Sequence, residues 1–137
     1  EARSRAGIPP SDPLPERLTS EALGQCALRL YRSLGFRLVW RVCSPGGDPL
    51  YQMRNPAGEI EAIQCIQRDS PVGLGEVLDL YERISQGEIQ RAAIWAPGGF
   101  TRQAVLWARG KPILLADRQE IGRLADSAAE AASEADR

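Results

Sequence analysis

The sequence predicts an α/β fold, a three-layer sandwich in which helices flank a central mixed β-sheet. Apolar residues first recur at helical spacing, in the segment that follows residue 18. Three short runs between residues 36 and 67 then alternate or cluster apolar residues as strands do, with turn residues between them. Beyond these runs, helix-like and strand-like segments alternate up to residue 126. The strand-helix-strand passage over 91–117 favours a right-handed parallel crossover.

Capping and turn residues indicate where the predicted elements begin and end. Thr19 or Ser20 can cap a first helix that Gly35 ends. The later elements are expected as strands at 36–42, 50–53 and 59–67, a helix from 77 to near 87, a strand at 91–97, a helix at 98–110, a strand at 111–117 and a helix at 118–126. In the first strand, one face should carry Phe36, Leu38, Trp40 and Val42. The spacing of Trp40, Trp95 and Trp107 places all three tryptophans in the core.

Both ends of the chain are expected to lie outside the folded domain, which we assign to residues 18–125. Residues 1–17 contain four of the ten prolines and should form a linker. Residues 126–137 are acidic and Ala-rich without an apolar stripe, so we expect a frayed or disordered tail. The chain starts without Met, and we expect it to be a domain of a larger protein.

Composition excludes several kinds of chemistry. There is no histidine, which removes histidine-based triads and histidine metal ligands. No apolar run is long enough to span a membrane. Residues 21–125 carry 13 basic and 11 acidic side chains, a difference of +2, which is only a weak electrostatic footprint for nucleic acid. Cys26, Cys43 and Cys65 form no CxxC pair, and we expect buried free thiols in a reducing cytoplasm.

The strand at 59–67 raises the question of function. Ile63, Cys65 and Gln67 should face one side, and Ala62, Gln64 and Ile66 the other, which leaves a polar amide on a face set for burial. An acid at the start of one hairpin strand and an acid or amide on the next can hold one divalent cation. A lysine two residues further along the second strand could then stabilise a metal-activated hydroxide that attacks a phosphodiester. Here the two ligands would be Asp48 and Gln64, and Ile66 occupies the lysine position.

Five motifs occur in a characteristic order: SLGF (33–36), PGGD (45–48), AIQCI (62–66), GGFTRQAVLWA (98–108) and KPILLADRQEIGRL (111–124). Together they resemble the Mrr-like branch of the restriction-endonuclease-like, or PD-(D/E)xK, nucleases. The resemblance covers about residues 18–125 and implies that family's α/β/α sandwich and a Mg²⁺-dependent DNA endonuclease ancestry. It also implies that Asp48 is the metal-binding aspartate and that Gln64 is the glutamine that this branch carries in place of an acid.

The sequence departs from the family pattern at the positions that the family uses for catalysis. Ile66 replaces the lysine, and the acid of the first helix would fall near Gly24 and Gln25. The resemblance therefore implies a catalytically degenerate domain of a prokaryotic, cytoplasmic protein, with no cofactor, that binds nucleic acid or a partner protein. The alternatives are an active Mg²⁺-dependent endonuclease, with Asp48 and Gln64 as ligands and Arg68 or a partner chain supplying the charge, and a structural or oligomerising domain.

Each candidate residue also has a simpler interpretation. Asp48 can shape a turn, Gln64 can be a satisfied buried amide, and Ile66 can fill a disused pocket. The candidate nucleic-acid contacts, equally consistent with an ordinary solvated surface and a helix cap, are Arg41, Arg54, Arg68, Thr101 and Arg102. The expected partners are DNA, other domains of the parent protein or a second copy of the chain in a homodimer, and no membrane is expected.

Overall fold

The computed structural model describes residues 19–43 and 47–135, so the predicted linker at 1–17 lies outside the described residues. Five strands form one mixed sheet in the order β2-β3-β4-β5-β6. The antiparallel part comprises β2 (Arg37–Cys43), β3 (Pro49–Arg54) and β4 (Ile60–Cys65). Two strands continue the sheet parallel to β4, β5 (Arg91–Trp95) and β6 (Ile113–Ala116).

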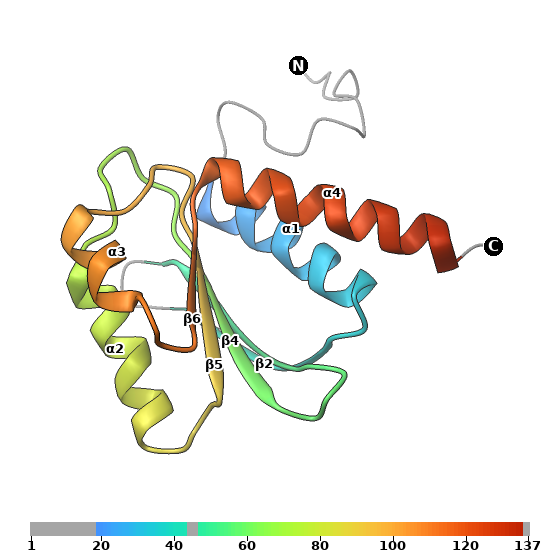
Figure 1. Ribbon diagram of the computed structural model, residues 1–137, viewed down its shortest axis with the longest axis horizontal. Coiled ribbons are helices and arrows are strands. Elements are labelled where there is room, and N and C mark those ends of the chain that lie inside the picture. Colours follow the sequence, from blue (N-terminus) through green and yellow to red (C-terminus); the bar gives the residue numbers. More distant parts are fainter. Residues whose placement is uncertain (1–18, 44–46, 136–137) are drawn as a thin grey trace.

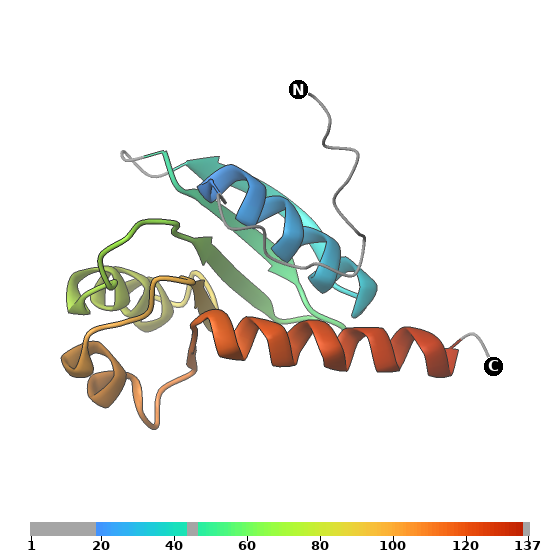
Figure 2. The ribbon, with the colours of Figure 1, turned by 90° about the horizontal axis from the view of Figure 1, so that it is seen from above.

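Four helices complete the three layers (Figures 1 and 2). On one face of the sheet lie α1 (Ser20–Ser33) and α4 (Arg118–Ala135), and on the other lie α2 (Leu74–Ser85) and α3 (Arg102–Ala108). Thr19 begins α1 as predicted, because its hydroxyl accepts a hydrogen bond of 3.0 Å from the backbone N–H of Ala22. The predicted order of elements and the α/β/α sandwich are therefore confirmed.

The sheet separates two apolar clusters, one under each helix layer. Ile63 and Cys65 of β4 pack on the α1 side, with Trp95 and Tyr31 in the same cluster. Ala62 and Ile66 pack on the α2 side, as the period-two alternation of this strand predicts. The polar chain of Gln64 therefore lies on the face that α2 covers.

The prediction for β2 is wrong in one respect, because a bulge interrupts this strand. Leu38 pairs with Met53 and Trp40 pairs with Gln52, so Val39 is an extra residue with no opposite partner. An extra residue reverses the alternation. Leu38 therefore packs on the α1 side, whereas Val42 packs on the α2 side.

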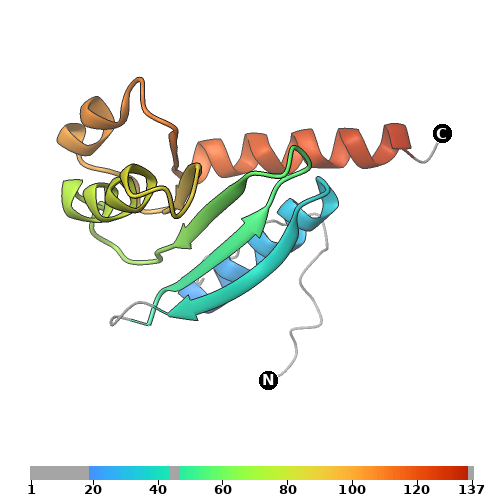
Figure 3. The ribbon, with the colours of Figure 1, turned by 90° about the horizontal axis from the view of Figure 1, so that it is seen from below.

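The bulge also changes the environment of Trp40. Trp95 is buried and Trp107 packs against the α2-side cluster, as predicted, but Trp40 is 49% exposed. It lies on the edge strand of the sheet, across a hollow from α2. In Figure 3, α1 lies behind β2 and β3, and no helix covers their front. The core prediction therefore fails for Trp40 because the helix layer on this side is too narrow to cover it.

Three further expectations need correction. The tail predicted as frayed continues α4 as far as Ala135, because alanine has the highest helix propensity and an existing helix needs no new nucleation. The helix predicted at 98–110 is shorter and begins only after Thr101. Of the three free cysteines only Cys65 is buried, and Cys43 is exposed at the end of the edge strand. No helix in the described part of the chain is long and apolar enough to cross a membrane.

Candidate functional site

The candidate ligands meet where the antiparallel strands end. Leu50 of β3 lies opposite Gln64 of β4, and Asp48 immediately precedes β3. Asp48 is half-buried, and its Oδ1 accepts a hydrogen bond of 2.7 Å from the hydroxyl of Ser20 at the start of α1. The same hydroxyl accepts a hydrogen bond of 2.9 Å from the backbone N–H of Gln67. Ser20 therefore joins α1 to both strands and fixes one oxygen of the aspartate.

The amide of Gln64 is held by the backbone beside it. Its Nε2 donates to the carbonyl oxygens of Asp48, at 3.3 Å, and of Pro49, at 3.2 Å. These bonds orient the amide across the two strands and satisfy its donors. Both interpretations of Gln64 therefore hold in part, since it is a satisfied amide and it also lines the pocket that contains Asp48.

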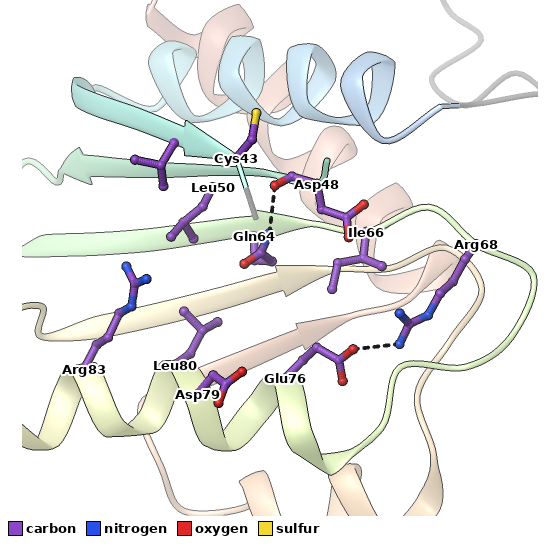
Figure 4. Close-up of a pocket in the computed structure, with 11 residues that line it drawn as sticks. Cys43, Asp48, Leu50, Gln64, Ile66, Arg68, Glu76, Asp79, Leu80 and Arg83 are labelled. Carbon is purple, nitrogen blue, oxygen red and sulfur yellow. Dashed lines mark hydrogen bonds and ion pairs between the residues drawn. The ribbon is translucent and has the colours of Figure 1, made fainter. Parts of the chain in front are cut away.

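Ile66 lies next to Asp48, with its side chain in the same pocket (Figure 4). It is only 3% exposed and belongs to the α2-side apolar cluster. Lys111, the chain's only lysine, donates from Nζ to the carbonyl of Trp107 at 2.8 Å and lies over that indole ring. It does not line this pocket, so it does not replace the missing cation.

The first helix cannot supply an acid from the position of Gly24. A Cβ atom at this glycine would lie 2.5 Å from Oη of Tyr51 and 2.9 Å from Cγ of Pro49, which leaves no space for a side chain. Burial raises the pKa of Tyr51. Glu21, one turn earlier, forms an ion pair with Arg41.

A pocket of about 420 Å³ surrounds these residues, and α2 supplies its other wall. Glu76, Asp79 and Arg83 extend from α2 into this space, and Arg68 pairs with Glu76 at 2.9 Å (Figure 4). Sequence reasoning missed these three helical residues. A signal was present, because positions 76, 79 and 83 share one face of the helix.

The predicted nucleic-acid contacts do not gather on one surface. Only Arg68 lines the pocket with Asp48 and Gln64. Arg41 is paired on the α1 side, and Arg54 binds a carbonyl in the β3–β4 hairpin loop. Thr101 caps α3, since its Oγ1 accepts from a backbone N–H of that helix at 3.2 Å, and Arg102 is the exposed first residue of α3.

The carboxylates that line this pocket are divided between Asp48 at the strand ends and Glu76 and Asp79 on α2. Asp48 offers one carboxylate with an oxygen already bound by Ser20, and Gln64 offers a neutral amide oxygen. Magnesium prefers octahedral oxygen ligands and is usually held by one or two carboxylates together with water and substrate phosphates. Within residues 19–43 and 47–135, no three acidic, histidine or cysteine side chains are grouped closely enough to hold a metal ion.

The fold and the strand-end pocket define a restriction-endonuclease-like domain. A model of the restriction endonuclease family Mrr_cat matches residues 15–125. The chain belongs to this family. No curated protein matches the sequence.

Solved structures give the same fold at low identity. The chain is similar to the DNA modification-dependent restriction endonuclease AspBHI, with a TM-score of 0.57 and 22% identity over 94% of this chain and 40% of that one. It is also similar to EndoMS in its apo form (TM-score 0.51, 18% identity, 75% of this chain and 47% of that one). A repair endonuclease from Pyrococcus abyssi has a TM-score of 0.51 and 12% identity over 76% of this chain and 49% of that one. The chain thus spans less than half the length of each of these proteins.

Proposed function

We propose that this domain is a catalytically inactive restriction-endonuclease-like module that contributes binding to a larger cytoplasmic protein. The observation that carries the proposal is the burial of Ile66 beside Asp48, in the position of the family's lysine. An apolar side chain there can neither orient a water molecule nor stabilise the charge that develops on a phosphate. Loss of one such group costs on the order of 10²–10³ in rate, by analogy with other transition-state donors.

Two further contacts support the proposal. The close approach of Gly24 to Tyr51 excludes an acidic side chain at position 24 of the first helix, and Gln64 is neutral and bonded to backbone carbonyls. Asp48 therefore supplies the carboxylate at the strand ends, whereas the other carboxylates of the pocket, Glu76 and Asp79, come from α2, and Glu76 is paired with Arg68. A phosphodiesterase needs several charged groups acting together. The part of each similar nuclease that this chain matches is less than half of that nuclease's length, so a role as one module among several is consistent with these similarities.

Cleavage of supercoiled plasmid in Mg²⁺ or Mn²⁺ tests the proposal. Wild-type protein and the Asp48→Ala variant should show the same background of nicking, because Ile66 occupies the position of the cation that would act with Asp48. Circular dichroism of both proteins must first confirm that they are folded.

The competing function is an active Mg²⁺-dependent endonuclease that retains Asp48 and Gln64 as ligands. Its support is that Glu76 and Asp79 bring two additional carboxylates to the same pocket. Nicking by the wild type that disappears in Asp48→Ala would establish this function and overturn the inactive one. Gln64→Ala would then distinguish a ligand from a merely structural amide.

A further inference from the structure

An open groove runs along α2 over the uncovered face of β2 and β3. The pocket at Asp48 adjoins a second hollow of about 540 Å³, and the two share Asp79 and Arg83 as lining residues. Trp40 of β2 and Gln52 of β3 form the floor of the second hollow. Figure 3 shows that no helix lies in front of these strands, so the sheet face is open to a partner.

Trp40 is the exposed apolar feature of this groove. It is 49% exposed, and its Nε1 donates a hydrogen bond to Oε1 of Gln52, which fixes the orientation of the indole. Val42 and Leu50 continue the apolar floor toward Asp48. A fixed, half-exposed indole offers a flat face to an apolar group or to a cation.

The walls of the groove are acidic. The two hollows are lined by five carboxylates, on Asp48, Glu76, Asp79, Glu82 and Glu88, and by two guanidinium groups, on Arg68 and Arg83, a net of −3. Arg68 is paired with Glu76, which leaves Arg83 against four carboxylates. No ion pair joins Asp79, Glu82 or Glu88 to another described residue.

The negative charge of the groove favours a cationic partner over a nucleic acid. A nucleic-acid strand that reached Asp48 along the groove would bring its phosphates past Asp79 and Glu82, and like charges repel. A cationic side chain meets carboxylates on the wall and an indole face on the floor, both of which attract it. The apolar floor favours a peptide that carries apolar groups as well as cations over a metal ion or a polyamine.

We propose that this groove binds an arginine-bearing segment of a partner protein, with one guanidinium stacked on Trp40 and facing the carboxylates of α2. The proposal rests on the binding role proposed above and names the class of partner. Arginine fits better than lysine, because its planar guanidinium can stack on the indole and still donate to a carboxylate. Phosphate polymers and anionic membranes are excluded by the same wall.

The test is fluorescence anisotropy with a labelled, end-blocked peptide of alternating arginine and leucine. A peptide with citrulline in place of arginine is the matched probe, since it keeps the shape and removes the charge. At about 50 mM salt, where screening still allows such contacts, the arginine peptide should bind and the citrulline peptide should not. Equal binding of the two peptides, or no binding of either, overturns the proposal.

Two groove variants locate the binding. Trp40→Ala should weaken binding roughly 3- to 30-fold, the range expected for a cation–π contact. The double variant Asp79→Asn with Glu82→Gln should weaken it by a similar factor and flatten its salt dependence. Matched controls outside the groove are Leu106→Ala, an exposed apolar residue of α3, and Asp126→Asn with Glu130→Gln, which change the net charge equally. If the control variants lose as much affinity as the groove variants, the proposed site is wrong.

The peptide-binding assay and the plasmid assay test the two proposals separately. Failure of the peptide to bind, without any nicking, removes the arginine partner and leaves the inactive module standing. Asp48-dependent nicking together with groove-dependent peptide binding removes inactivity and keeps the partner. Duplex DNA that binds and is lost in Trp40→Ala would show that the groove takes nucleic acid instead, and would overturn this inference.

Discussion

The close approach of α1 to β3 at Gly24 leads to a quantitative prediction about stability. In Gly24→Ala, the new Cβ would lie 2.5 Å from Oη of Tyr51 and 2.9 Å from Cγ of Pro49, where ordinary contact begins near 3.4 Å. Overpacking of this kind costs about 1–3 kcal/mol, and exchanging glycine for alanine within a helix returns about 1 kcal/mol. We expect a net loss of up to about 2 kcal/mol in the free energy of unfolding.

Tyr51→Phe supplies the matched partner for a double-mutant cycle. The hydroxyl of Tyr51 is buried and has no hydrogen-bond partner among the described residues, so removing it should stabilise the domain by about 1 kcal/mol. It also removes the atom nearest to the new Cβ, while Pro49 remains close. In the Tyr51→Phe background, Gly24→Ala should therefore cost about 1 kcal/mol less than it does alone.

Urea unfolding followed by fluorescence measures all four proteins, because the buried Trp95 reports on the core between the sheet and α1. If the two substitutions add to within about 0.5 kcal/mol, the hydroxyl is not the obstacle at Gly24. Tyr51 would then not be the residue that excludes a side chain at position 24.

Two further predictions concern the thiols and the phenols. A thiol reagent should modify Cys43, which is exposed, well before Cys65, whose pKa is raised by burial; modification of Cys65 at the rate of Cys43 would contradict the buried position. Below about pH 8.5 the Cys65 thiol is protonated in both the folded and unfolded states, but above it only the unfolded state ionises, so the free energy of unfolding should fall by up to about 1.4 kcal/mol per pH unit. Burial raises the pKa of Tyr31 to about 12, which extends this fall above about pH 10. Urea titrations should show a shallower fall for Cys65→Ala between about pH 8.5 and 10, and an unchanged slope would refute the assignment to this thiol.

The sequence carried enough information to predict which face of the sheet each apolar residue of β4 occupies, although the strand, Ile60–Cys65, is shorter than the predicted 59–67. Both faces of this strand are covered, so the period-two pattern separates the cluster of Ile63 from that of Ile66. It also predicted that Ile66 would fill the space beside Asp48, because an apolar residue in a pocket of this kind has no other way to avoid water.

The position of Trp40 and the acidic wall of α2 were not predicted, because they depend on strand pairing that a single segment does not encode. The bulge at Val39 arises from the register between β2 and β3, and it moves Trp40 from the predicted core to an open face. The acidic wall of α2 was missed for the same reason. Asp79 and Arg83 are ordinary solvated residues on an amphipathic helix until the sheet places β2 and β3 across from them.

The bulge in the edge strand β2 also affects whether copies of this domain pair through their sheet edges. An exposed strand edge with large apolar side chains is a template for intermolecular pairing, and Val39 and Trp40 are both about half exposed. The bulge interrupts the flat row of backbone groups that such pairing needs, and the same strand carries the charged residues Arg37 and Arg41, the second paired with Glu21 on the α1 side. The irregularity that turns Trp40 toward the groove thus also acts as a gatekeeper against aggregation.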